Sequence, residues 1–468
     1  MGQEKELKRV LGKADLFAIG FGAIIGWGWI SMGAFWIGGA GPLGACLSFV
    51  FAGLLMMFVA LVYAELASAM PRAGGPQNFA WRAYGPKMSF VAGWACLLNP
   101  VVFVSWLCNA MVVALDYLFP LSETPLLYTL YGYEIHVGTL AAYMILAMLM
   151  IWLAYTGIQG MSKIQNMSVI VMIIITVLFI AAAFVKGEPK NFEPLIANGA
   201  KGVIANVLTC ATFLAGFECI PQTSEESRVS PRELGKIIIM VMGAAVLWFV
   251  LTILATSLAL SHGEIKGSSL AAVDAMTVLF NKNPLAGKAM IIVGILGIIT
   301  SWISTYISGS RLMYSMARGG MLPSALAKLH PVHKTPCRTI ILMGIFMLLS
   351  SFLGGGVNVW YPSAGGFGSV VSYTIVAFSF LTLRKKAPDM ARPYRVKYAF
   401  IGVMAAAMGT ILIVISLPGF PGSGLKWPYE IIMVVLWMIL GSALFMRIRR
   451  KPEGFSEINN TMKDILEQ

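Results

Sequence analysis

The stretch GAIIGWGWISMG, residues 22–33, lies in the first long apolar run of the chain and decides how the rest is interpreted. Gly22, Gly26, Gly28 and Gly33 each weaken a helix by about 1 kcal/mol relative to alanine. In hydrocarbon, an unsatisfied backbone group costs several kcal/mol, so irregular backbone persists only where it lines a protein-enclosed cavity or a ligand site. If this run crosses a membrane, its glycines predict a helix break and a binding site at mid-depth.

The composition predicts that the run does cross a membrane. The chain is 58% hydrophobic and 12% charged, whereas soluble domains are about 25% charged. Because about 20 apolar residues span a bilayer, we expect an all-α integral membrane protein with twelve transmembrane helices. The predicted spans are 15–38, 43–69, 88–119, 138–157, 163–186, 200–222, 236–262, 285–317, 337–354, 360–384, 398–418 and 428–447.

The basic residues predict the orientation of these spans. Most of the 34 Lys and Arg residues fall before the first span, in alternate loops, or after the last span. Since Lys and Arg concentrate in cytoplasmic loops, we expect both termini in the cytoplasm and the protein in the plasma (inner) membrane. The net charge of +13 is spread over short loops, so it does not form the single basic face that nucleic-acid binding needs. The first apolar run is too long for a cleavable signal peptide.

A second interruption is predicted in the sixth span. The sequence TFLAGFECIPQTSEES, residues 212–227, places Gly216 in mid-span, followed by Glu218 and the helix-breaking Pro221. Inverted-repeat transporters place paired discontinuous helices at corresponding positions of their two halves. Glycines in membrane helices also mediate close packing, but the match between the two positions favours a shared site.

Broken helix ends predict the chemistry of that site. A helix that restarts inside the membrane presents free N–H groups and a partial positive charge, which suit a carboxylate. The end of the preceding half-helix presents free carbonyls, which suit an ammonium group or a cation. The two ends together are complementary to a zwitterion. No charged side chain is required, which agrees with the scarcity of charge in these spans.

Five segments together resemble the amino acid–polyamine–organocation (APC) superfamily of secondary transporters. They are VYAELASAMPRAGGPQNFAWRAYGPKMSFVAGW (62–94), YTGIQGMSKIQN (155–166), FLAGFECIPQTSEESRVSPRELGKII (213–238), SGSRLMYSMARGGMLPSALAKLHPVHKTPCRTI (308–340) and LRKKAPDMARPYRV (383–396). The resemblance implies a LeuT-like, five-plus-five inverted repeat with discontinuous helices 1 and 6. It implies a cytoplasmic N-terminus (1–14), a first repeat (15–190), a second repeat (191–384), two further helices (385–447) and a cytoplasmic tail (448–468).

The resemblance also implies site residues. The substrate carboxylate would meet the amides of Gly26, Trp27 and Gly28. The ammonium would meet carbonyls of the two preceding half-helices, at Ile24, Ile25, Phe213, Ala215 and Gly216. Selectivity would come from the third and eighth helices, through Asn99, Val104, Trp302 and Thr305, and the aromatic rings of Phe213 and Trp302 are candidate gates.

Two indoles depart from the family pattern, which usually has a small residue between the two glycines and an aliphatic residue after them. Trp27 and Trp29 stand there in this chain. In the cavity they would shrink the site and offer cation–π contacts worth about 0.5–2 kcal/mol. Either ring could instead face lipid or a neighbouring helix. A small zwitterion or a methylated amine is therefore an alternative to a large cationic amino acid.

Energy coupling is the second departure. Proton-coupled and some sodium-independent relatives carry a lysine on the fifth helix, where this chain has Met172, and the next lysine is Lys186 at the membrane edge. Glu218 is then the candidate for proton coupling, because a buried carboxylate can titrate near neutral pH. The alternative is a permanently hydrogen-bonded structural role. Asp116 and Glu65 lie toward span ends, where we expect solvation or loop pairing rather than a role in transport.

The remaining polar groups predict no catalytic or metal chemistry. His330 and His333 have a tolerable metal spacing but no acid or thiol beside them, and four scattered histidines do not assemble an active site. Arg311 and Arg318 either anchor a cytoplasmic gate or extend to the interface. Six cysteines are interpreted as small buried hydrophobes: Cys46, Cys96, Cys108, Cys210, Cys219 and Cys337.

Three functions remain open from the sequence. The favoured one is an amino acid permease that works by alternating access as an exchanger (antiporter), facilitator or proton symporter. The second is a transporter of an amine, polyamine or betaine on the same fold. The third is a membrane sensor that binds amino acids without transport. We expect a small-molecule substrate and a lipid bilayer as partners, no enzyme activity, no cofactor, no metal, and a monomer or homodimer.

Overall fold

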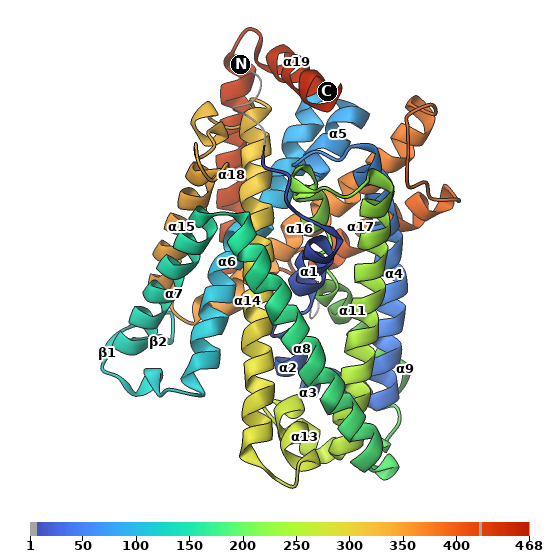
Figure 1. The fold of residues 1–468 in the computed structure, drawn as a ribbon, viewed down its shortest axis with the longest axis vertical. Helices are drawn as coiled ribbons and strands as arrows, with labels where there is room; N and C mark the ends of the chain where they lie inside the picture. The colour runs from blue at the N-terminus through green and yellow to red at the C-terminus, as the bar shows by residue number, and fades with distance from the viewer. Residues whose placement is uncertain (1–6, 421–423, 468) are drawn as a thin grey trace.

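The computed structural model describes residues 7–420 and 424–467, which form a bundle of long helices (Figure 1). The α-helices are α1 (Lys13–Ile24), α2 (Gly28–Ser31), α3 (Gly33–Ala40), α4 (Pro42–Ala69), α5 (Pro76–Tyr84), α6 (Pro86–Asp116), α7 (Val137–Thr156), α8 (Ile158–Lys186), α9 (Gly199–Phe213), α10 (Cys219–Gln222), α11 (Pro231–Ala259), α12 (His262–Gly267), α13 (Ala271–Leu279), α14 (Pro284–Arg318), α15 (Cys337–Ser350), α16 (Gly356–Lys386), α17 (Phe400–Ser416), α18 (Tyr429–Arg450) and α19 (Gly454–Glu467). Short 3₁₀ turns are η2 (Leu121–Glu123), η3 (Pro189–Phe192), η4 (Ser224–Glu226), η5 (Ser324–Ala327) and η6 (Ser351–Leu353), and the strands are β1 (Leu126–Leu130) and β2 (Tyr133–His136).

The helices agree with the predicted membrane spans. Within the described residues, nine helical segments are long and apolar enough to cross a membrane, the first of them the interrupted segment Lys13–Ser31. Two shorter apolar helices occupy the predicted ninth and eleventh spans. The predicted sixth span is divided between α9 and α10. The all-α membrane class is therefore confirmed, with the first and sixth spans both discontinuous.

Both described ends of the chain lie at one end of the bundle, here called the terminus face (Figure 1). Residues 10 and 11 donate their amides to the Glu226 carbonyl, so the N-terminal segment lies on the loop after α10. Helix α13 lies at the opposite end, here called the hairpin face, and the β1–β2 hairpin projects from the side of the bundle nearer to that end (Figure 1). The hairpin is antiparallel, with Leu130 opposite Tyr133, and was not predicted because it is a short exposed connection rather than part of a span.

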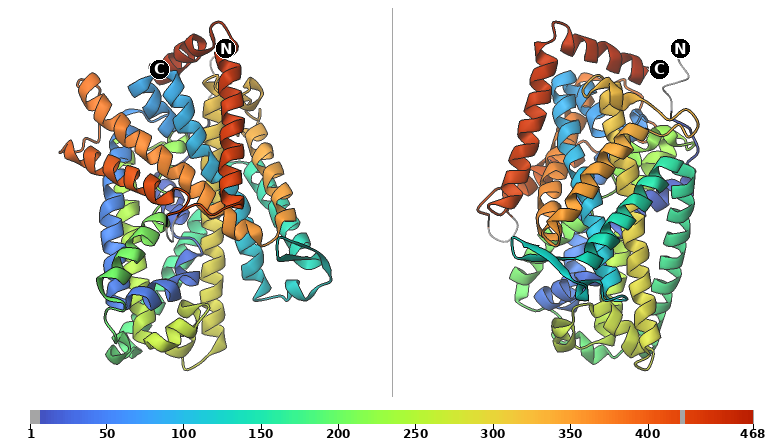
Figure 2. Two further views of the ribbon diagram at one scale, coloured as in Figure 1. Left: turned by 180° about the vertical axis from the view of Figure 1, so that it is seen from behind. Right: turned by 90° about the vertical axis from the view of Figure 1, so that its left-hand side faces the viewer.

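The interrupted first span lies at the centre of the bundle. Helix α1 packs against α8, α11 and α14, whereas α18 packs on the outside (Figure 2). Close approach depends on small residues, since small side chains allow helix backbones to meet. A Cβ added to Gly297 of α14 would lie 2.9 Å from the carbonyl oxygen of Gly26. The first break therefore packs directly against α14.

Candidate functional site

The first break separates α1 from α2 at residues 25–27. Ile25 has φ −90° and ψ 80°, which ends the helix. Among the described residues, the amides of Trp27, Gly28 and Trp29 donate no backbone–backbone hydrogen bond. Three donors at a helix start make this the positively polarised end that the sequence predicted.

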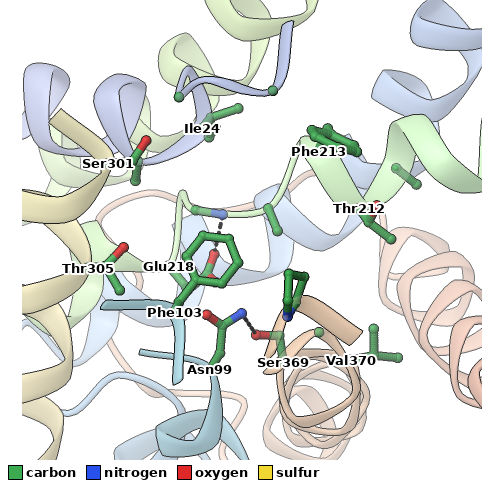
Figure 3. A pocket seen from close by; sticks show the side chains of 18 of the residues that line it. Ile24, Asn99, Phe103, Thr212, Phe213, Glu218, Ser301, Thr305, Ser369 and Val370 are labelled. Carbon is green, nitrogen blue, oxygen red and sulfur yellow. Dashed lines mark hydrogen bonds between the residues drawn. The ribbon is translucent and has the colours of Figure 1, made fainter. Parts of the chain in front are cut away.

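The second break separates α9 from α10 and touches the first. Gly216 has φ +129°, a conformation that glycine adopts readily and other residues rarely do. Its amide donates to Oε2 of Glu218 at 2.8 Å (Figure 3). A Cβ on Gly216 would lie 2.9 Å from the carbonyl carbon of Ala23. Two interruptions far apart in the sequence therefore meet in space.

A cavity of about 510 Å³ lies where the breaks meet. Ten of the predicted residues line it: Ile24, Gly26, Trp27, Gly28, Asn99, Phe213, Ala215, Gly216, Glu218 and Thr305. Figure 3 shows Ser301 and Thr305 on one side of this cavity and Thr212 and Val370 on the other. The remaining predicted residues, Ile25, Trp29, Val104 and Trp302, are buried outside its lining.

The two indoles of the first break have different environments. Trp27 is among the residues that line the cavity, and its ring covers Gly294 of α14, where an added Cβ would lie 2.1 Å from the ring. Trp29 packs edge-on against Trp248, with ring centroids 5.7 Å apart. Of these two residues, Trp27 lines the cavity and Trp29 does not.

Phe213, the predicted gate, lines the cavity at the end of α9. Its ring packs edge-on against Trp36 at 5.0 Å. It also covers Gly28, because a Cβ there would lie 2.4 Å from the Phe213 ring. The aromatic ring thus lies over the restart of the first helix.

Ser301 of α14 and Ser369 and Tyr373 of α16 complete the site and were not singled out from the sequence. Ser301 donates to the Gly22 carbonyl at 2.6 Å and so caps the end of α1. Asn99 donates to Ser369 of α16 at 2.7 Å, which joins α6 to α16 beside the cavity (Figure 3). Tyr373 also lines the cavity. The run of small residues in SAGGFGS, residues 363–369, was the available signal that α16 approaches other elements closely.

Helix α8 stabilises α1 without a lysine. Gln165 donates from Nε2 to the Ala18 carbonyl at 2.8 Å and to Ser304 at 3.1 Å. Ser304 in turn donates to the Ile19 carbonyl at 2.8 Å. Met172 is fully buried. Uncharged side chains of α8 and α14 thus donate hydrogen bonds to backbone carbonyls of α1.

Two ion pairs close the bundle between the cavity and the terminus face. Arg311 donates to both carboxylate oxygens of Glu226 at 2.8 and 3.1 Å, and each side chain is 1% exposed. Arg318 binds Glu225 at 2.7 and 2.6 Å. Burial raises the pKa of the Glu225 carboxyl, but the hydrogen bonds and charge of Arg318 outweigh it and lower that pKa below its ordinary value. Both arginines are therefore paired inside the bundle rather than extended to its edge.

Asp116 and Glu65 were expected to be solvated or paired with loops, and both accept hydrogen bonds from loop amides. Glu65 is fully buried and accepts from Arg384 and from the Val396 amide at 2.7 Å. Asp116 accepts from the Ser122 amide at 2.8 Å. Neither acid lines the cavity at the breaks. Both hold connections between helices.

Comparison with known proteins identifies the family. A family model described as amino acid permease matches residues 11–443. The chain is 29% identical to the branched-chain amino acid permease BcaP of Bacillus subtilis, over 96% of this chain and 94% of that protein. It is 26% identical to the methylthioribose transporter of the same organism, over 96% and 95% of the two chains. It is 27% identical to cationic amino acid transporter 4 of Mus musculus, over 83% and 62%.

These matches cover nearly all of the described fold, and the family is one of transporters rather than enzymes. A multi-pass helical bundle with an internal cavity at two helix breaks is consistent with a small-molecule substrate. This chain belongs to the amino acid permease family of the APC superfamily.

Proposed function

We propose that this permease carries a neutral α-amino acid by alternating access between two inverted repeats, 15–190 and 191–384. The observation that carries the proposal is the junction of the two breaks at one cavity. The unpaired amides of Trp27, Gly28 and Trp29 suit a carboxylate, and the half-helix carbonyls suit an ammonium. Backbone groups alone can thus hold both charges of a zwitterion.

The lining favours an uncharged substrate side chain. Among the described residues that line the cavity, Glu218 is the only charged one. Its carboxylate already accepts from the Gly216 amide, so it is engaged within the break. Apolar groups such as Met56, Phe103 and Leu107 form much of the wall. The name of the Bacillus subtilis branched-chain permease agrees with this substrate class.

The conformation supports a state open to the outside. The wall of the cavity includes Thr212 and Ser363, and both residues are exposed. The terminus face is closed by the Arg311 and Arg318 ion pairs. With cytoplasmic termini, as the basic loops predict, the hairpin face is extracellular. We assign the structure to an outward-open state of a twelve-span plasma-membrane permease.

A ligand series tests the carboxylate site directly. We expect purified protein to melt at a higher temperature with neutral L-amino acids but not with the amines that lack their carboxylate. A ligand at about 100 times its dissociation constant adds about 2.7 kcal/mol to the folded state. Thermal melting against each matched pair measures the effect. Equal stabilisation by amine and amino acid would contradict the carboxylate site.

A second candidate is an amine or betaine substrate, because Trp27 is among the residues that line the cavity. This candidate would be favoured if amines or N-methylated ligands raise the melting temperature of the unmodified protein but not that of Trp27→Leu. Uptake and counterflow in sealed vesicles separate either transporter from a sensor. A sensor would bind ligand saturably without accumulating it.

Glu218 is proposed to couple transport to protons. We expect Glu218→Gln to flatten the pH dependence of uptake, because this carboxylate is 8% exposed and joins the second break through the Gly216 amide. Uptake into vesicles at a series of external pH values measures the profile. Glu123→Gln, an exposed acid between α6 and α7, is the matched control. An unchanged profile in Glu218→Gln leaves this residue a structural role only.

A further inference from the structure

The cavity extends beyond the two breaks into a region here called the side arm. The side arm is lined by residues of four helices: Met56 of α4, Leu208, Thr209 and Thr212 of α9, Val370 of α16, and Leu412, Ile415 and Ser416 of α17. Helix α17 follows the two proposed repeats, so a lining contribution from it is unexpected. Figure 3 shows Thr212 and Val370 across the cavity from Ser301 and Thr305.

Packing fixes α17 in this place. It packs against α4 and α16, and a Cβ on Gly409 would lie 2.4 Å from Oγ1 of Thr374 in α16. Leu412 and Ile415 are three residues apart and therefore share one helix face. Both are buried, at 4% and 8% exposure. Val414 of the same helix is 49% exposed and faces the outside of the bundle.

The side arm presents an apolar surface despite its hydroxyl groups. Thr212 donates its hydroxyl to the Thr209 carbonyl at 2.7 Å, and Ser416 donates to the Leu412 carbonyl at 2.7 Å. Such bonds within a helix leave the methyl and methylene groups as the main contact surface. Neither an anion nor a cation finds a charged partner there. The chemistry suits an aliphatic chain.

The position and volume of the side arm indicate which part of a substrate would enter it. The polar groups for an ammonium and a carboxylate belong to the breaks, at one side of the same cavity. At about 30 Å³ for each water, a cavity of about 510 Å³ holds much more than the polar head of an amino acid. A substrate held at the breaks can therefore extend its side chain toward α17.

We propose that the side arm is a subsite for elongated apolar side chains, so that this permease takes long aliphatic or aromatic amino acids as well as small ones. The proposal rests on the proposed function, since the head group must bind at the breaks. Each methylene placed in an apolar site strengthens binding about fourfold. Affinity should therefore rise with chain length until the arm is full.

The test is a series of L-alanine, L-norvaline, L-norleucine and L-2-aminooctanoate, with dissociation constants from calorimetry on the purified full chain. In the unmodified protein we expect about fourfold tighter binding for each added methylene. In Leu412→Trp, the indole fills the arm, and we expect no gain beyond norvaline. Alanine is the internal reference for each variant. Val414→Trp places the same indole on the outside of α17 and should keep the full chain-length dependence.

A second variant that fills the side arm keeps the test valid if Leu412→Trp fails to fold. Thr212→Trp changes an exposed wall residue on α9, and its control is Ile204→Trp, 64% exposed on the same helix. Loss of the chain-length gain in either filling variant, with the gain retained in the controls, supports the subsite. An undiminished gain in both filling variants, or equal affinity across the series in the unmodified protein, overturns it. Failure of every member to bind would overturn the proposed function as well.

Discussion

Gly216→Ala is expected to reduce uptake by about 100-fold or more, since misplacing site groups by about 1 Å can cost that factor. Gly216 has φ +129°, where a residue with a side chain is strained by about 1–3 kcal/mol. The added Cβ would also lie 2.9 Å from the Ala23 carbonyl carbon and 3.0 Å from the Ile24 amide nitrogen. Both are backbone atoms, which cannot swing aside. The two breaks must therefore separate. Uptake of the best ligand from the melting series measures the loss.

The control for Gly216→Ala is a glycine with open space around it. A Cβ on Gly243 of α11 meets nothing within 4 Å, so Gly243→Ala should keep normal uptake and gain slightly in helix stability. Changes at the first break should also reduce uptake. Gly28→Ala meets the ring of Phe213 and Gly26→Ala meets the hydroxyl of Ser301, and both neighbours are side chains. Normal uptake in all three break variants would remove the breaks from the site.

Glu226→Gln is expected to destabilise the protein by about 3–5 kcal/mol, because it leaves Arg311 as a buried charge without its carboxylate. Both side chains are 1% exposed, and water cannot replace the lost partner. The same change should open the terminus face, since the pair joins the loop after α10 to α14. Thermal melting measures the first effect. Labelling of a cysteine introduced at Ser315, near this face on α14, measures the second.

A double variant separates charge from packing. Combining Glu226→Gln with Arg311→Met removes both charges, and stability should recover because a neutral pair has no unpaired buried charge. Glu233→Gln is the surface control: its partners Lys13 and Lys236 are more than half exposed, so no loss should be measurable. A melting temperature for Glu226→Gln equal to that of Glu233→Gln would show that the buried pair does not hold the closed face.

Most of the fold follows from local patterns in the sequence. Apolar runs of membrane length predict the spans. Ten of the twelve predicted spans each coincide with one helix to within a few residues, and the first and sixth are interrupted. The helix α19 and the β1–β2 hairpin lie outside those runs. They were not predicted because a hydrophobicity criterion does not detect short amphipathic or exposed elements.

The two breaks were also predicted from sequence alone, through Gly26, Gly28 and Gly216. Pro221, expected to break the sixth span, instead lies within the first turn of α10. Glycine and proline interrupt a helix through their own backbone chemistry, which needs no knowledge of neighbours. That the breaks touch each other is a property of the tertiary structure. It depends on how α1 and α9 are placed by α4, α8 and α14.

The sequence does not predict which side chains face the cavity, because this depends on the rotation of each helix and on contacts with residues far away in the sequence. Trp27 and Trp29 are two residues apart, about 200° around a helix, so their rings point to different neighbours, Gly294 and Trp248. Sequence alone does not set that rotation, whereas packing of Trp29 on Trp248 does. The contributions of α16 and α17, and the pairing of Arg311 with Glu226, likewise join segments far apart in the chain. The sequence by itself determined the spans and their interruptions, because these are local backbone properties. The tertiary structure decided the walls of the cavity and its closure, because these depend on contacts between separate helices.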